Sequence, residues 1–225
     1  MVLRGLLFRA IPIFVFSFAV PGLVMAQVCL CWQCGLGTHK SYVIQAASMS
    51  PALDPGDCAI ARRVAGKPED LTHGDIVVFK HPAHNTEFVK RLIAMPGDTV
   101  QMRDGSIWLN NSEIVQIPLP DHIEPYVRRG AASVLAHCRE PVPLGGDCIK
   151  QQALETLFNG VKYPVLNIGD HRLDHTDVQT VPEGHVFVLG DNRDNSMDSR
   201  ISQNVGGIGF VPIENITGVV KVVRK

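Results

Sequence analysis

The chain has 225 residues, a net charge of −1 and 45% hydrophobic residues. This length can bury one real core without a structural metal or dense disulfides, and the near-neutral charge without a Lys/Arg-rich run argues against a nucleic-acid-binding protein. Fifteen prolines, twenty glycines and many short Val/Ile runs broken by PG, GD, DG and NG predict short strands and turns, and hence a mainly β protein.

An apolar segment at residues 10–30 follows Arg4 and Arg9 and contains no charged side chain. A bilayer is crossed by about 20 apolar residues, and the preceding basic residues favour a cytoplasmic N-terminus at residues 1–9. We therefore expect a single-pass anchor in the inner (cytoplasmic) membrane, with the rest of the chain on the extracytoplasmic side. A cleaved signal peptide is the alternative, because small residues, Val24 and Ala26, stand at the spacing that such cleavage requires.

Six cysteines are consistent with an oxidising compartment. Cys138 and Cys148 bracket a loop rich in proline and glycine, so we expect a disulfide between them. Cys58 lies in the apolar run DCAIA and is expected to be a small core residue. The remaining three follow the apolar segment and are Cys29, Cys31 and Cys34. The CWQC sequence has the spacing of a thiol-redox motif, but it lacks the strand-to-helix context of such motifs, and we expect no redox role.

Beyond residue 40, apolar runs alternate with turn signals, a pattern typical of antiparallel strands. The expected strand runs are, in order, 41–46, 58–65, 76–79, 88–94, 99–102, 106–110, 161–168, 184–192 and 209–223. Residues 118–180 are less regular and rich in proline and histidine, so we interpret them as an inserted, smaller second lobe. Residues 31–117 and 181–225 would then form the main β core.

Ser48, in the turn-like stretch ASMSPALDPGD, and Lys90, within the apolar run FVKRLIA, are candidate chemical groups. Each has an ordinary structural interpretation, since serine is common in turns and a strand lysine is usually solvated. A serine nucleophile needs a base, and no histidine stands in a recognisable triad context. Burial can make a lysine that base by lowering its pKa from about 10.4. Strand alternation places Lys90 on one face with Phe88 and Leu92.

Four stretches, ASMSPALDPGD, GDIVVF, VKRLIAMPGD and GDNRDNSMDSR, occur in the same order as in bacterial type I signal peptidases. The chain resembles that serine protease family over about residues 42–110 and 182–223. The resemblance implies a signal-peptidase-like antiparallel β fold with a smaller inserted lobe and an N-terminal transmembrane helix. It also implies a membrane-bound endopeptidase that removes signal peptides from exported precursor proteins and needs no cofactor or metal. Cleavage would follow a small residue at position −1, with another small residue at position −3.

The resemblance implies roles for Ser48, for Lys90 and for several residues of the GDNRDNSMDSR stretch. Ser48 would be the nucleophile and Lys90 the general base. Ser196 would hydrogen-bond to the lysine and orient it. The other expected supporting residues are an ion pair near the site, Asp198 and Arg200, and two residues that build the turn, Asp191 and Asn192. The expected substrate-binding residues are Tyr42, Ile44, Phe88 and Val89.

Two positions depart from the family pattern. Ala46 stands where a serine often donates a hydrogen bond to the oxyanion, so the backbone N–H of Ser48 and an unidentified second donor would have to serve. The sequence Ser50-Pro51-Ala52 is also unusual for the family, and we expect it to be tolerated.

Alternative interpretations remain at this point. His171 and His175 stand four apart among aspartates, as in some metal sites, but their surroundings give little helical support and we expect a solvated loop. A non-enzymatic, membrane-anchored β binding module would leave Lys90 solvated. A specialised conjugation-type, pilin-processing Ser-Lys peptidase is another candidate. A self-cleaving repressor would need a helix-turn-helix where this chain has an apolar segment.

Overall fold

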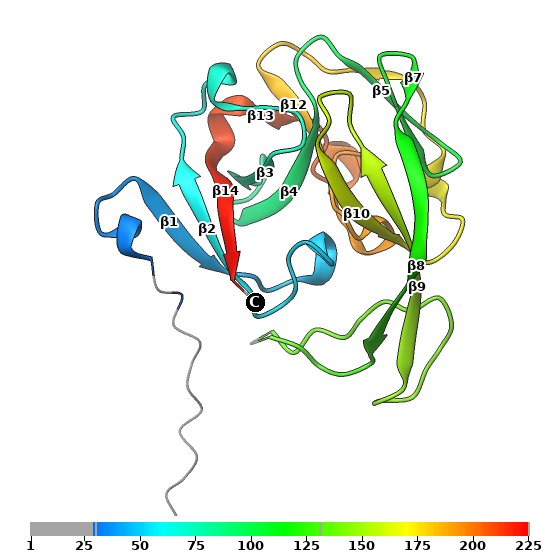
Figure 1. Ribbon diagram of the computed structural model, residues 1–225. Coiled ribbons are helices and arrows are strands. Elements are labelled where there is room, and N and C mark those ends of the chain that lie inside the picture. Colours follow the sequence, from blue (N-terminus) through cyan, green and yellow to red (C-terminus); the bar gives the residue numbers. More distant parts are fainter. Residues whose placement is uncertain (1–28, 30, 131, 225) are drawn as a thin grey trace, which may run out of the picture.

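The computed structural model describes the whole chain except residues 1–28, 30, 131 and 225 (Figure 1). The expected membrane anchor at residues 10–30 therefore lies outside the described residues, apart from Cys29. Within the described part, no helix is long and apolar enough to span a bilayer. All pairings between named strands are antiparallel, which confirms the prediction of a mainly β, antiparallel fold.

The described residues form fourteen strands and seven short 3-10 turns. The strands are β1 (His39–Val43), β2 (Cys58–Arg63), β3 (Ile76–Lys80), β4 (Glu87–Ala94), β5 (Thr99–Arg103), β6 (Ser106–Leu109), β7 (Ser112–Glu113), β8 (Val115–Pro125), β9 (Asp147–Thr156), β10 (Lys162–Asn167), β11 (Gln179–Thr180), β12 (His185–Leu189), β13 (Val211–Pro212) and β14 (Ile216–Arg224). The 3-10 turns are η1 (Trp32–Cys34), η2 (Ala47–Met49), η3 (Pro68–Asp70), η4 (Arg172–Asp174), η5 (Arg193–Asn195), η6 (Gln203–Val205) and η7 (Ile213–Asn215).

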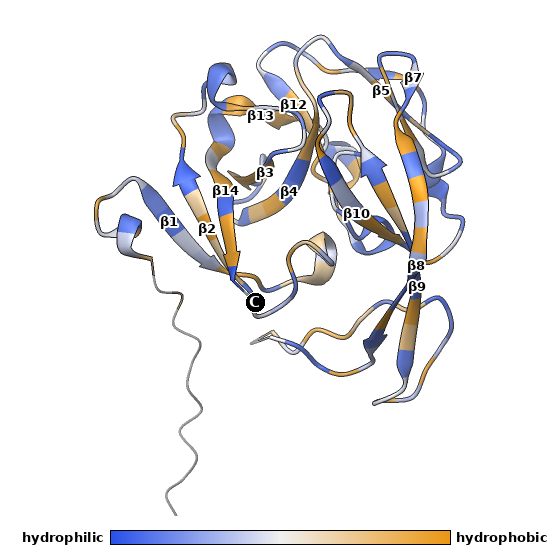
Figure 2. Cartoon of the chain, in the orientation of Figure 1, coloured by the Kyte–Doolittle hydropathy of each residue, from blue (hydrophilic) through white to orange (hydrophobic). Residues whose placement is uncertain are grey.

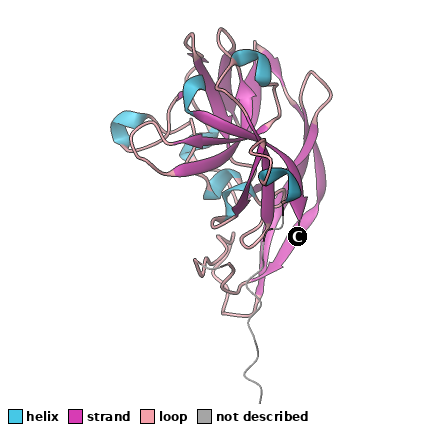
Figure 3. Cartoon of the chain, turned by 90° about the vertical axis from the view of Figure 1, so that its left-hand side faces the viewer, coloured by secondary structure: helices cyan, strands magenta, loops and turns pink. Residues whose placement is uncertain are grey.

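Three sheets make up the fold. A seven-stranded sheet has the order β1-β2-β14-β3-β4-β12-β13, a four-stranded sheet the order β11-β5-β6-β7, and a three-stranded sheet the order β10-β9-β8. One apolar cluster draws on all three sheets, with Ile93 from β4, Val100 from β5 and Val165 from β10. Apolar residues colour much of β4 and β14 in Figure 2. Figure 3 shows that strands dominate and that the helical segments are single turns.

Strand β4 is buried along most of its length because it lies between β3 and β12 in the sheet. In the register of the hairpin, Lys90 stands opposite Val77, and Val89 stands opposite Val78. Leu92, two residues after Lys90, is fully buried in a second apolar cluster. The position of β4 inside the sheet therefore keeps the side chain of Lys90 buried.

The irregular region predicted between residues 118 and 180 contains two long strands that the sequence did not reveal, β8 and β9. Pro118 and Pro120 lie within β8, where the sequence pattern argued against a strand. Proline is tolerated there because β8 is an edge strand of the three-stranded sheet, so missing N–H groups leave no partner unsatisfied. The weak strand expected at 161–168 is β10.

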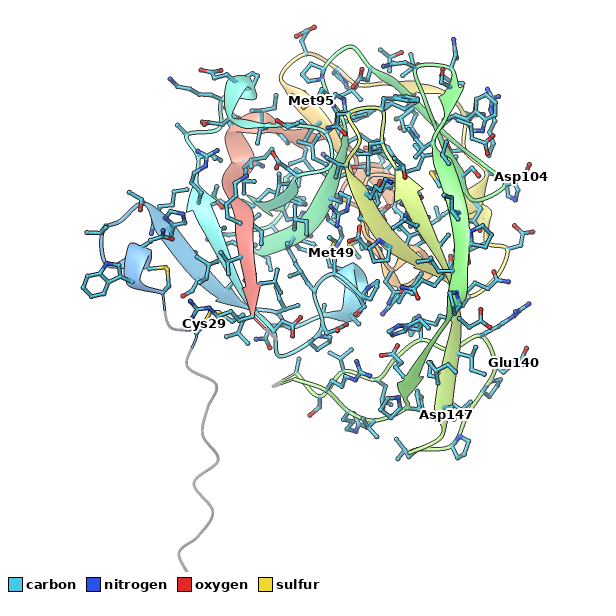
Figure 4. The ribbon with its side chains drawn as sticks, viewed as in Figure 1. Cys29, Met49, Met95, Asp104, Glu140 and Asp147 are labelled. Atoms are coloured by element: carbon cyan, nitrogen blue, oxygen red, sulfur yellow. A yellow bond between two sulfur atoms is a disulfide. The ribbon has the colours of Figure 1, made fainter. Side chains whose placement is uncertain are left out.

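Three disulfides link all six cysteines. The predicted Cys138–Cys148 bond is present, and Cys31 is bonded to Cys34. The expectation for Cys58 was wrong, because its sulfur is bonded to Cys29 (labelled in Figure 4). Cys58 begins β2 opposite Val43, so this bond ties the segment before η1 to the place where β1 ends and β2 begins.

Candidate active site

Ser48 lies in the middle of η2, a single turn between β1 and β2. The next residue, Met49 (labelled in Figure 4), has no exposed surface and anchors the turn in the interior. From the other side, Asn192 donates from its backbone N to the carbonyl O of Ser48 at 3.1 Å and from Nδ2 to the carbonyl O of Ala47 at 3.0 Å. Ser48 is therefore held on both sides while its own side chain stays half-buried.

Lys90 reaches Ser48 from β4. Its Nζ donates to Ser48 Oγ at 2.7 Å and to the carbonyl O of Val89 at 3.1 Å. The side chain is 2% exposed, and this burial lowers the pKa of Lys90 to about 8, although Asp198 and Asp191 act in the opposite direction. The site thus joins a hydroxyl to an amine that is neutral at mildly alkaline pH. The buried position contradicts the solvated lysine expected for a binding module.

The residue after Lys90 forms an ion pair that the sequence did not reveal. Arg91 donates from Nε and Nη2 to the two carboxylate oxygens of Asp191, at 2.8 and 2.6 Å. Its Nη1 donates to the carbonyl O of Gly74 at 2.8 Å, and its guanidinium lies 4.0 Å from the centre of the Tyr163 ring. The basic pair in VKR, within an apolar run, was the available signal. The ion pair fixes β4 to the turn that begins at Asp191.

Asp198 and Arg200 form the expected ion pair, with Arg200 Nε 2.9 Å from Asp198 Oδ1. Asp198 also accepts from the backbone N of Gly190 at 3.2 Å. Burial alone would raise the pKa of Asp198, but Arg200 holds it below its usual value. Asp198 is therefore a carboxylate that secures the turn at both ends.

Ser196 differs from the expectation. In the described part of the chain, the hydrogen bonds of Lys90 Nζ go to Ser48 and Val89, and none joins it to Ser196. The Ser196 hydroxyl is buried beside Gly190, where a Cβ built on the glycine would overlap Ser196 Oγ. In this geometry Ser196 lies near Ser48 without a hydrogen bond to the amine of Lys90, and its hydroxyl helps to lower the pKa of Asp198.

A groove of about 360 Å³ contains both Ser48 and Lys90. It is also lined by all four residues expected to bind substrate, Tyr42, Ile44, Phe88 and Val89. Most of its surface is apolar, and further lining residues include Ala46, Gln45, Asn195 and Met197. The last two lie within the GDNRDNSMDSR stretch, but no role was expected for either.

An ion pair bridges two walls of this groove. Lys40 on β1 donates from Nζ to both carboxylate oxygens of Glu87 on β4, each at 2.9 Å, and Tyr42 Oη lies 3.5 Å from the same carboxylate. The hydrogen bond to Glu87 raises the pKa of Lys40. Strands β1 and β4 are not neighbours in the sheet, so the sheet curls to bring them across the groove from each other.

The histidines considered as metal ligands are engaged in local hydrogen bonds. His171 Nδ1 accepts from the backbone N of Leu173 and caps η4, and His175 Nε2 lies 2.9 Å from Asp170 Oδ1. Among the described residues, no group of three or more His, Cys, Asp or Glu side chains is arranged to hold a metal ion.

Comparison with known proteins gives a family for this chain. The family model described as "Signal peptidase, peptidase S26" matches residues 17–224. A signal peptidase I of Rickettsia bellii (strain OSU 85-389) is 35% identical over 201 residues, covering 88% of this chain and 62% of the relative. One from Bacillus licheniformis is 31% identical over 182 residues, covering 80% of this chain and 73% of the relative.

The chain spans about three fifths of the length of the Rickettsia bellii relative and 51% of a signal peptidase I of Rickettsia canadensis (strain McKiel), to which it is 37% identical. The crystal structure of a signal peptidase I from Enterococcus faecalis V583 aligns with 67% of this chain and 97% of that chain, with 27% identity and a TM-score of 0.36. That superposition is loose and carries no part of the assignment. From the family model and the sequence relatives, the chain belongs to the signal peptidase family, peptidase S26.

Proposed function

We propose that the protein is a serine endopeptidase that removes signal peptides from exported precursor proteins, with Ser48 as nucleophile and Lys90 as general base. The observation that carries the proposal is the 2.7 Å contact between the buried Lys90 Nζ and Ser48 Oγ within an apolar groove. Family membership supports the same activity.

The chemistry follows from a neutral amine next to a hydroxyl. Lys90 accepts the proton of Ser48 as Oγ attacks the carbonyl carbon of the scissile bond. The tetrahedral intermediate expels the amine of the new N-terminus, which receives the proton from Lys90. This leaves an ester between Ser48 and the signal peptide. Lys90 then removes a proton from water, which hydrolyses the ester and returns Ser48 to its starting state.

The groove supports a substrate in extended conformation. Strand β1 is the edge of the seven-stranded sheet, so its free backbone groups can pair with a peptide laid beside it. Tyr42 and Ile44 on one side and Phe88 and Val89 on the other leave an apolar channel that favours small side chains. The supporting ion pairs, Arg91–Asp191 and Asp198–Arg200, would keep the dyad walls in place.

The proposal includes a membrane position and a domain division. The apolar segment at residues 10–30 would hold the groove near the bilayer from which a signal peptide emerges. Residues 31–117 and 181–225 would form the catalytic core, and residues 118–180 an inserted lobe.

The test uses the full-length protein in detergent micelles with a precursor that carries Ala-X-Ala before its cleavage site. Wild type should cut after the second alanine, as identified by sequencing the new N-terminus. Ser48→Ala and Lys90→Met should each abolish the cleavage, whereas Lys80→Met, at the exposed end of β3, should retain it. Cleavage that survives in both dyad variants would contradict the mechanism. No cleavage by wild type would contradict the proposed substrate class and would favour the pilin-processing peptidase or the binding module.

A further inference from the structure

The oxyanion that would form at Ser48 needs a second hydrogen-bond donor. The negative oxygen formed when Ser48 attacks a carbonyl needs hydrogen-bond donors aimed at it. The backbone N–H of Ser48 makes no hydrogen bond within the described part of the chain and can be one donor. Ala46, two residues earlier in the same groove, has only a methyl group and cannot be the second.

The groove contains few other side-chain donors. Apart from the dyad, those among its lining residues are Tyr42, Gln45, Thr86 and Asn195. Tyr42 Oη faces the Glu87 carboxylate at 3.5 Å, and Gln45 Nε2 donates to the carbonyl O of Val43 at 3.2 Å. Thr86 precedes Lys90 by four residues on an extended chain, which is roughly 13 Å along the backbone. These three side chains are therefore engaged elsewhere or remote from the dyad.

Asn195 is the remaining donor in the groove lining, and its carboxamide makes no hydrogen bond to another described residue. Its backbone N donates to the carbonyl O of Asn192 at 3.0 Å, which closes η5. Asn192 in turn binds the carbonyl O of Ser48 and of Ala47. Asn195 therefore lies three positions after a residue that is hydrogen-bonded directly to the turn that contains Ser48.

The other flank of Asn195 is fixed as well. Ser196 follows it directly and is buried against Gly190, and a Cβ on Gly190 would lie 2.5 Å from the carbonyl O of Ser48. The backbone on both sides of Asn195 is thus packed against η2. A carboxamide on such a support loses little freedom when it binds an anion, as a preorganised donor should.

We propose that Asn195 is a further catalytic residue whose Nδ2–H donates a hydrogen bond to the oxyanion formed at Ser48. This inference rests on the proposed function. The carboxamide donates without transferring a proton, so it stabilises the charge of the intermediate at every pH where the protein is folded. It replaces the donor that a hydroxyl side chain at position 46 would provide.

The test compares the full-length wild type with Asn195→Ala, Asn195→Asp and Asn204→Ala on the Ala-X-Ala precursor. Asn195→Ala should lower kcat by about 10²-fold and leave KM within about threefold, because the lost bond exists mainly in the transition state. Asn195→Asp has nearly the same shape but places a carboxylate near the oxyanion, so it should be no faster than Asn195→Ala. Asn204 is exposed, and its variant should match wild type.

A rescue distinguishes catalysis from a structural role. Adding Ala46→Ser to Asn195→Ala supplies a hydroxyl donor in the same groove and should recover roughly tenfold or more of the lost kcat. Unchanged kcat in Asn195→Ala, a rise in KM alone, or a lowered kcat that Ala46→Ser does not improve would each overturn the inference. Wild-type cleavage that Ser48→Ala abolishes would still support the proposed function, so failure of this inference is separable from failure of that function.

Discussion

The carboxylate of Asp191 receives two hydrogen bonds, of 2.8 and 2.6 Å, from the guanidinium of Arg91 in the interior of the protein. Arg91 follows the general base of the proposed mechanism, and Asp191 begins the turn that binds the nucleophile through Asn192. The two residues are 100 positions apart in sequence. This ion pair therefore adds to the pairing of β4 with β12 in holding β4 against the turn at residues 190–200.

Replacing Asp191 by Asn should destabilise the protein by about 3–5 kcal/mol, because it leaves the guanidinium of Arg91 buried without its counter-charge. The urea concentration at the unfolding midpoint, with its slope, measures the change. Asp70→Asn is the matched control, since the Asp70–Arg62 pair is partly exposed and should contribute less than about 1 kcal/mol. Equal losses in both variants would show that burial of the Arg91 pair is unimportant.

Gly190→Ala should reduce cleavage by about 10²-fold or more, since the new Cβ would overlap Ser196 and the carbonyl O of Ser48 and displace the nucleophile. Gly169→Ala meets no atom within 4 Å and serves as the control. Rates of precursor cleavage by the two variants, compared with wild type, give the answer. A Gly190→Ala enzyme as fast as Gly169→Ala would refute the close packing of this turn on η2.

The Cys29–Cys58 bond should appear when unreduced protein is digested and its linked peptides are identified by mass spectrometry. Its cysteines are 29 residues apart, whereas Cys138 and Cys148 are 10 apart. A longer closed loop restricts the unfolded chain more, so removing the Cys29–Cys58 bond should lower the free energy of unfolding by about 4 kcal/mol and removing the Cys138–Cys148 bond by about 3 kcal/mol. Thermal unfolding of the two paired Cys→Ser variants compares these losses. A free thiol at Cys58 in the unreduced protein would contradict the pairing.

Most of the strands could be predicted because their signals are local, and the resemblance to a known family predicted that Ser48 and Lys90 meet, which the structure shows. A lysine within FVKRLIA is conspicuous in an apolar strand, and the stretch around Ser48 precedes it in the same order as in the family that the chain resembles. Turn residues such as Pro96-Gly97 and Asp104-Gly105 mark where strands end. Such strands and turns can be predicted because the residues that form them are also the residues that carry the sequence signal.

Other features depend on which distant segments meet. The proline-containing β8 is a strand only because it occupies a sheet edge, and Cys58 is bonded only because Cys29 reaches the start of β2. The position of Ser196 relative to Lys90 is decided by the packing of Gly190. Whether Glu87 meets Lys40 is decided by how the sheet curls. No local pattern in the sequence carries that information.

Lys90 should also make stability depend on pH. Its pKa of about 8 in the folded protein lies below that of an unfolded lysine, so between about pH 8 and 10.5 the unfolded chain binds more protons. The contribution of this group to the free energy of unfolding therefore rises with pH in that window. Below pH 8 the buried charge is unfavourable by roughly 3 kcal/mol, and Lys90→Met should relieve up to this amount.

Urea unfolding of wild type and Lys90→Met at pH 7 and pH 10 checks this expectation. The stabilisation from Lys90→Met should be larger at pH 7 and should shrink at pH 10. Lys80→Met, at an exposed position, should show no such difference between the two pH values. A Lys90→Met effect that is independent of pH would mean that Lys90 titrates as an ordinary lysine.

The dependence of kcat/KM on pH, measured with wild-type enzyme and the Ala-X-Ala precursor from pH 6 to 10.5, tests the central claim most directly. Only the neutral amine of Lys90 can accept the Ser48 proton, so kcat/KM should rise tenfold per pH unit at low pH and level off above about pH 8. A rise that continues toward pH 10.5 would indicate an unperturbed lysine. A profile that is flat across this range would contradict a lysine base altogether.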